Sequence, residues 1–147
     1  MVYERSAPFP RALLTGILGL SALSQHDTTK ALRLLELATD SLRSSGAAGW
    51  WTSAPLDLEI GAILVAAGLP DSAEPHLLAA GTTPWLAVQA QYHLGTVAES
   101  RKDFTEARLY YQRVVRWWRD CDPELRSFTD RASRDLARLD GDTGSGH

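Results

Sequence analysis

The chain has too little cysteine, basic charge and continuous apolar sequence for several classes of protein. Its 147 residues include one cysteine, Cys121, which excludes an internal disulfide framework. The net charge of −3 argues against a nucleic-acid-binding protein, whose contact surface would be basic. The apolar run from Ala12 to Leu23 is too short to span a bilayer. What remains is a domain with 44% hydrophobic and 22% charged residues, large enough to bury a core.

Basic residues are also missing from the middle of the chain. No Lys or Arg lies between Arg43 and Arg101, whereas ten of the fifteen basic residues lie from Arg101 onward. Acidic residues are interleaved with these late basic ones, which is typical of a solvated, salt-bridged surface. A functional role for the acidic middle is the alternative.

The N-terminal segment fits two interpretations. Arg5 and Arg11 precede an apolar run that ends in Ala22-Leu23-Ser24, a pattern similar to a signal peptide with its cleavage site. Pro8 and Pro10 are unfavourable in such a segment, and the run is in register with the repeats described next. We therefore favour a cytoplasmic protein whose N-terminal run is a helix, with export as the alternative.

One pattern of small and apolar residues occurs three times. Each copy has a large apolar residue followed by glycine, and further small or apolar residues 12, 16 and 19 positions after the glycine. The copies are Leu18-Gly19, Ala31, Leu35, Ala38; then Ile60-Gly61, Ala73, Leu77, Ala80; then Leu94-Gly95, Ala107, Tyr111, Val114. The last two copies lie 34 residues apart and the first two lie 42 apart, which indicates an insertion of eight residues. Gly and Ala allow antiparallel helices to approach closely while the larger residues fill the surrounding space.

Capping and breaking residues predict seven helices. They run over about 10–24, 28–43, 55–68, 71–81, 84–100, 103–119 and 123–139. The predicted caps include Asp27, Ser53, Asp71, Thr83 and Asp103. The last helix has one apolar stripe and one charged face, as expected of a helix that closes a stack, and residues 141–147 are predicted to be a disordered tail.

The period of 34 residues resembles that of the tetratricopeptide repeat family. The resemblance rests on the three copies above and, in the last third, on Tyr92-His93-Leu94-Gly95, Asp103-Phe104, Tyr110-Tyr111 and Asp122-Pro123-Glu124-Leu125. This last third is similar to the repeat arrays of bacterial serine/threonine kinases and transcriptional regulators. The resemblance implies an all-α, right-handed α-solenoid in one domain, 1–140, with helix hairpins at about 12–43, 54–81 and 88–119 and a capping helix at 123–139. The sequence departs from the family where an aromatic residue is usual, at Thr15, Asp57 and Gln91.

The resemblance also implies a groove lined by the first helix of each hairpin, which would bind a protein or peptide partner. The lining residues would include Leu13, Leu20, Leu58, Val65, Tyr92, Thr96 and Glu99. The Lys, Arg and Asn with which some family members hold an acidic peptide terminus are missing at these positions, so we expect a groove that is apolar at its N-terminal end. Trp50 and Trp51, in the insertion, are predicted either to contact the partner or to pack against the neighbouring helices.

No motif predicts catalysis, a metal or a cofactor. The four histidines, His26, His76, His93 and His147, lack the spacing of metal ligands, and no kinase motif is present. We therefore expect a non-catalytic interaction module.

The first predicted helix is apolar on every side. We expect Leu18, Gly19 and Ala22 to pack inside, which leaves Leu13, Ile17 and Leu20 bare. A second copy, a further N-terminal domain or residues 1–10 would cover them. The alternative function is therefore a regulatory region of a larger bacterial signalling protein that self-associates as a homodimer through this helix.

Overall fold

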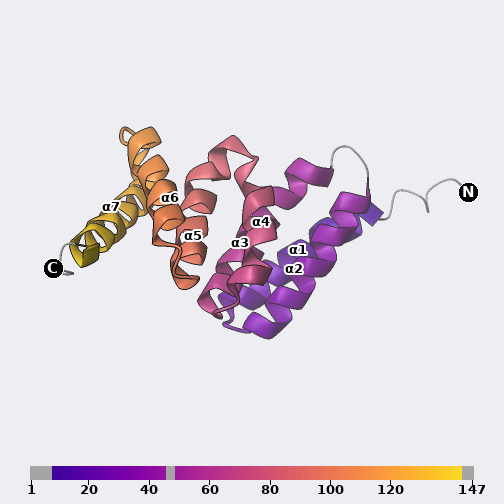
Figure 1. Ribbon diagram of the computed structural model, residues 1–147. Helices are drawn as coiled ribbons and strands as arrows, with labels where there is room; N and C mark the ends of the chain where they lie inside the picture. Colours follow the sequence, from indigo (N-terminus) through magenta and orange to yellow (C-terminus); the bar gives the residue numbers. More distant parts are fainter. Residues whose placement is uncertain (1–7, 46–48, 144–147) are drawn as a thin grey trace, which may run out of the picture.

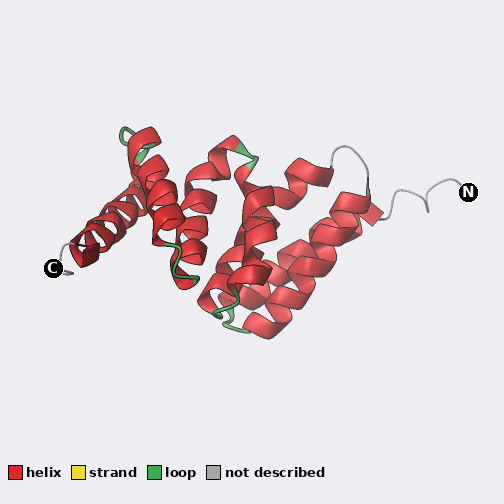
Figure 2. Cartoon of the chain, viewed as in Figure 1, coloured by secondary structure: helices red, strands yellow, loops and turns green. Residues whose placement is uncertain are grey.

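The computed structural model describes residues 8–45 and 49–143 of the chain. Every regular element within these residues is helical (Figure 2), which confirms the all-α class. The helices are α1 (Pro8–Ser24), α2 (Thr28–Ser44), α3 (Gly49–Ala66), α4 (Pro70–Gly81), α5 (Ala87–Ser100), α6 (Phe104–Trp117) and α7 (Pro123–Thr143). A 3₁₀ turn, η1 (Pro84–Leu86), precedes α5.

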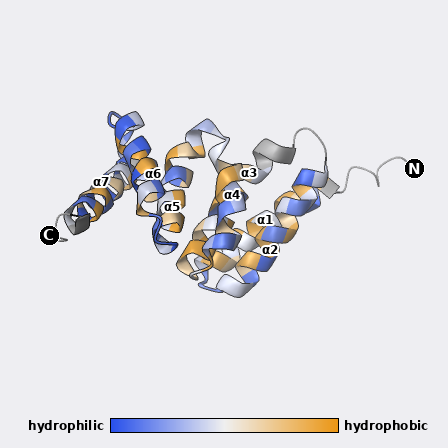
Figure 3. Cartoon of the chain, in the orientation of Figure 1, coloured by the Kyte–Doolittle hydropathy of each residue, from blue (hydrophilic) through white to orange (hydrophobic). Residues whose placement is uncertain are grey.

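The helices follow one another across the molecule in chain order, from α1 and α2 at one end to α7 at the other (Figure 1). Each helix packs against the next one in sequence, and the pairs α1–α2, α3–α4 and α5–α6 are joined by short connections. The odd-numbered helices also meet, since α3 contacts α5 and α5 contacts α7. Hydrophilic residues become more frequent towards α6 and α7 (Figure 3).

Three equivalent glycines are points of close approach between paired helices. A Cβ atom placed on Gly61 would lie 2.6 Å from Leu77 Cγ, and one on Gly19 would lie 2.9 Å from Leu35 Cγ. The same atom on Gly95 would meet the ring of Tyr111. The other residues of the repeated pattern in the second helix of each pair, Ala31, Ala38, Ala73, Ala80, Ala107 and Val114, are all buried. In all three copies the glycine of one helix therefore meets the residue sixteen positions later in the next helix.

Two of the predicted helix starts are confirmed by their caps. Asp27 Oδ1 accepts a hydrogen bond from the backbone N–H of Lys30 at 3.1 Å, and Asp103 Oδ1 accepts one from Glu106 at 3.0 Å. These carboxylates satisfy backbone donors that have no partner within the helix.

The predicted start of α3 was wrong. We expected the helix to begin near Pro55 with Ser53 as its cap, but it begins at Gly49 and Pro55 lies inside it. A proline there removes one backbone hydrogen bond. Ser53 and Ala54 are buried, so packing against neighbouring helices holds these turns helical despite the proline.

The predicted starts of α4 and α5 also need correction. α4 begins at Pro70, whose fixed φ and missing N–H suit the first helical position. Asp71 does not cap this helix, because its Oδ1 accepts hydrogen bonds from Arg101 at 2.7 and 3.0 Å. Thr83 makes no capping bond either, and the chain forms the 3₁₀ turn before α5.

The final helix is longer than predicted. It continues to Thr143, so the first residues of the expected disordered tail are helical, and residues 144–147 lie outside the described part. Arg108 of α6 holds this end in place, since it donates hydrogen bonds to the Leu139 carbonyl and to Asp140 Oδ1.

In α1 the small residues face inward and the large ones outward. Ala12, Gly16, Gly19 and Ala22 are buried, whereas Leu13, Leu14, Ile17, Leu18 and Leu20 are all exposed. This confirms the expectation that Leu13, Ile17 and Leu20 are bare, but the expected burial of Leu18 was wrong. Pro8, Phe9 and Pro10 belong to α1 itself, and residues 1–7 lie outside the described part.

Candidate functional site

The predicted groove corresponds to the surface formed by α1, α3, α5 and α7, here called the odd-helix face. Three hollows lie along it, one at each junction between successive odd-numbered helices. Their linings change from apolar at the α1 end to charged at the α7 end. The expected groove residues are distributed unequally among them.

The hollow between α1 and α3 is apolar. It has a volume of about 440 Å³ and is lined by Leu23, Thr28, Ala62, Ile63, Ala66 and Ala67. Leu20 lies one turn before Leu23 on α1 and is exposed, as is Leu13 two turns earlier. The alanines of α3 make room here because their side chains end at Cβ. The expectation of an apolar N-terminal end to the groove agrees with this lining.

The hollow between α3 and α5 is small. Its volume is about 150 Å³, and it is lined by Val65, Gly68, Pro70, Thr96, Val97 and Ser100. Val65 is half-buried and also packs against the core. Thr96 lines both this hollow and the next one.

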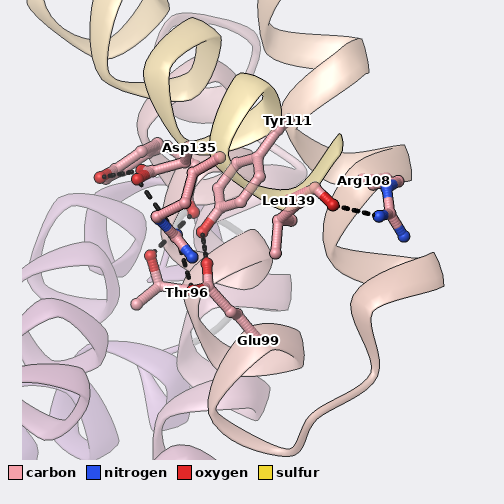
Figure 4. Close-up of polar contacts among 8 residues, drawn as sticks. Thr96, Glu99, Arg108, Tyr111, Asp135 and Leu139 are labelled. Carbon is pink, nitrogen blue, oxygen red and sulfur yellow. Dashed lines mark hydrogen bonds and ion pairs between the residues drawn. The ribbon is translucent and has the colours of Figure 1, made fainter. Parts of the chain in front are cut away.

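The hollow between α5 and α7 is polar and is crossed by a network of hydrogen bonds (Figure 4). The Tyr92 hydroxyl donates to Asp135 Oδ2 at 3.0 Å, and the Tyr111 hydroxyl donates to Glu99 Oε2 at 3.1 Å. Arg138 bridges the two carboxylates, with its Nη2 at 2.7 Å from Glu99 Oε1 and 3.3 Å from Asp135 Oδ1. The residues that we expected to contact a partner here instead hold α7 of the same chain.

Burial and neighbouring carboxylates keep the two tyrosines of this network protonated. Burial raises the pKa of Tyr92, and the nearby Asp135 raises it further. Burial likewise raises the pKa of Tyr111 above its usual value. Both phenols therefore remain hydrogen-bond donors over the whole physiological range, which suits a structural network.

Leu58 was wrongly expected to line the groove. Its side chain is buried in the core cluster that also contains Leu56 and Ile60. Leu58 stands at the position of Gly16 in the first repeat and Tyr92 in the third, and these residues are also turned towards neighbouring helices. This position is therefore a contact between helices in all three copies.

Trp50 and Trp51 lie in the first turn of α3 rather than in a loop. Their side chains lie outside the described part of the structure. The prediction that they contact a partner therefore stays a prediction.

Sequence reasoning missed a buried charge at Asp57 in α3. Its Oδ1 accepts hydrogen bonds from Arg43 Nη2 at 2.6 Å and from His76 Nδ1 at 2.8 Å, while its side chain is 1% exposed. Oδ2 has no hydrogen-bond partner among the described residues. The available signal was the charged residue at a position where the repeat family usually has an aromatic one. Arg43 and His76 tie α2 and α4 to this carboxylate, so the cluster joins three helices.

Within the described residues, no group of three or more His, Cys, Asp or Glu side chains is arranged to hold a metal ion. None of the helices described here is both long and apolar enough to cross a membrane. Comparison of the sequence with protein-family models, with curated proteins and with solved structures finds no match in any of the three.

Proposed function

We propose that the protein is a non-catalytic interaction module of the tetratricopeptide type that binds an apolar segment of a partner protein on the odd-helix face. The three glycine contacts support this architecture, because a contact repeated with one spacing is what stacked hairpins require. In this arrangement the pairs α1–α2, α3–α4 and α5–α6 form a right-handed solenoid closed by α7. A cytoplasmic scaffold in a bacterial signalling protein is the setting that the resemblance of the C-terminal part suggests.

The observation that carries the proposal is the apolar hollow between α1 and α3, with the exposed Leu20 one turn before its lining residue Leu23 and the exposed Leu13 two turns earlier on α1. Solvent-exposed apolar side chains around a hollow are typical of binding sites for peptides and helices. α3 and α5 contain no Lys or Arg, so the middle of this face lacks the cations that would hold an acidic terminus. The α7 end is already occupied by the chain's own ion pairs, which limits the partner to the N-terminal part of the face.

Site-specific cross-linking tests this proposal. A photoreactive amino acid at position 20 should cross-link a partner in cells that make the protein, whereas one at position 78 should not, although Leu78 on α4 is also exposed. The purified partner should then bind Leu20→Asp and Ala66→Glu at least about tenfold more weakly than the original chain. Leu78→Asp is the matched control and should bind normally. A partner that binds all these variants equally would contradict the proposed site.

A further inference from the structure

The outward surface of α1 divides into two parts. Leu13 and Leu20 adjoin the groove just described, whereas Leu14 and Leu18 lie on the side of the helix that points away from it, at the end of the row. Leu14 and Leu18 are 57% and 52% exposed. We call this second part the end face of α1.

The repeat register shows what normally covers such a surface. The residues equivalent to Leu18 in the next two copies are Ile60 and Leu94, and they are 0% and 2% exposed. Leu14 corresponds to Leu56 and Ala90, which are likewise buried. Within the described residues, this face of α1 is therefore exposed although the equivalent faces of α3 and α5 are buried.

The contacts of these equivalents identify the missing element as another helix pair. Leu56 Cδ1 lies 3.1 Å from the position of a Cβ on Gly16 of α1, and Ala38 of α2 lies next to the same point. Ala90 Cβ lies 3.5 Å from the corresponding point on Gly81 of α4. Each α3-like helix is therefore covered by the pair that precedes it in the row. α1 has no preceding pair among the described residues.

We propose that the end face of α1 binds the same face of a second copy, so that the protein forms a two-fold dimer. Head-to-tail stacking is disfavoured, because the exposed residues of α7 at the other end include Arg126, Asp130, Arg131 and Arg134. Leucines placed against these groups would force charges out of water. The end face of α1 meets no such conflict with itself, since Arg11 is the only charged residue of α1.

An antiparallel arrangement of the two α1 helices gives a self-consistent register. If the two-fold axis crosses the end face level with residue 16, Leu14 of one copy lies opposite Leu18 of the other, and Arg11 lies opposite Ser21. Each arginine then faces a hydroxyl rather than the other arginine. Knob-like leucines from both helices interdigitate, as in antiparallel helix pairs of known proteins.

The size of the surface sets the strength of this dimer. Leu14 and Leu18, with the neighbouring Ile17, expose on the order of 300 Å² of apolar surface per copy, which is less than most stable two-fold interfaces bury. We therefore expect a weak dimer that forms and dissociates with concentration, with a Kd on the order of 100 μM.

Sedimentation over a concentration series tests the proposal on the full chain. The original protein should shift from monomer to dimer, and Leu14→Asp with Leu18→Asp should remain monomeric over the same range. Leu37→Asp on α2 is the matched control, since Leu37 is 57% exposed but lies away from the end face. Circular dichroism of each variant separates loss of association from loss of folding. A protein that stays monomeric up to several hundred micromolar overturns the proposal, as does a dimer that the double variant retains.

Disulfide trapping tests the register. In a Cys121→Ser background, a mixture of Leu14→Cys and Leu18→Cys chains should form the mixed disulfide faster than either chain forms its own. Equal rates for all three pairings would overturn the antiparallel arrangement. The groove proposal is tested separately at Leu20 and Ala66, so the failure of one proposal leaves the other standing.

Discussion

Gly95→Ala is the most direct test of the repeated glycine contact. Alanine is the better helix former, and in an open helix position the change would stabilise by up to about 1 kcal/mol. At Gly95 the added methyl meets the Tyr111 ring, with Cδ1 at 2.7 Å and Cζ at 3.0 Å from the ideal Cβ position. Real Cβ atoms essentially never approach carbon so closely, so the ring or the backbone must move.

The ring has little room to move. Tyr111 is 1% exposed, and its hydroxyl is fixed by the hydrogen bond to Glu99. Overpacking of this kind costs about 1–3 kcal/mol or more, which exceeds the gain in helix propensity. We expect a net loss of about 2 kcal/mol in the free energy of unfolding, or a fall of roughly 4–8 °C in Tm for a domain of this size.

Two other glycines and a second-site change serve as controls. Gly81→Ala should be neutral or slightly stabilising, because its new methyl would make an ordinary contact of 3.5 Å with Ala90. Gly16→Ala should lie between the two, since the nearest atom is a flexible Leu56 methyl at 3.1 Å. Tyr111→Val removes the ring atoms, so in that background Gly95→Ala should become stabilising. Denaturant unfolding measures all of these, and a stabilising Gly95→Ala in the original background would refute the reasoning.

Three further predictions concern the polar groups. Asp57→Asn should lower the free energy of unfolding by about 1–3 kcal/mol, because it weakens the charge-assisted hydrogen bonds to Arg43 and His76. Urea denaturation measures this loss, with Asp71→Asn as a control at an exposed carboxylate. His93 has a pKa lowered by burial and by Arg131, so the unfolded chain takes up its proton more readily. The contribution of neutral His93 to the free energy of unfolding should be complete above about pH 6.5 and should fall as the pH drops through the lower pKa of the folded state. In a plot of stability against pH, His93→Gln should remove this slope. Arg138→Met should increase hydrogen exchange in α7 and leave exchange in α1 and α2 unchanged, because it removes the bridge between Glu99 and Asp135. If α7 exchanges at the same rate in the variant and the original chain, the bridge does not hold this helix.

Much of the helix pairing could be predicted because it depends on spacing along the chain. A glycine in one helix and a larger residue sixteen positions later must meet if the two helices are antiparallel and the turn between them is short. Gly61 and Leu77 satisfy this relation, and so do Gly95 and Tyr111. Helix ends were harder, because Pro55 marks a start by local rules while the burial of Ser53 and Ala54 extends α3 before it. The start of α3 is therefore set by tertiary packing and not by the local sequence signal.

The polar parts of the site could not be predicted for a different reason. Tyr92 meets Asp135 across 43 residues, and no local pattern connects them. Asp57 meets Arg43 and His76 from two other helices, and the sequence alone shows only that a charge lies at a core position. Leu58 was misplaced because the family pattern assigns a face to each position, whereas the neighbouring helix decides whether that face is open.

The two ends of the row differ in a way that constrains any partner. α7 covers α5 as the next odd-numbered helix would, and it presents charged residues beyond that contact, so the row ends there without exposing the core. α1 instead presents leucines at positions whose equivalents in α3 and α5 are buried. A polar replacement of Leu14 or Leu18 should leave the α1–α2 contact intact, because both side chains are exposed and Gly19, on the buried side of α1, makes the close approach to Leu35 of α2. We therefore expect folding of the described residues not to require leucine there, and the proposed association through the end face would give these leucines a role that folding does not.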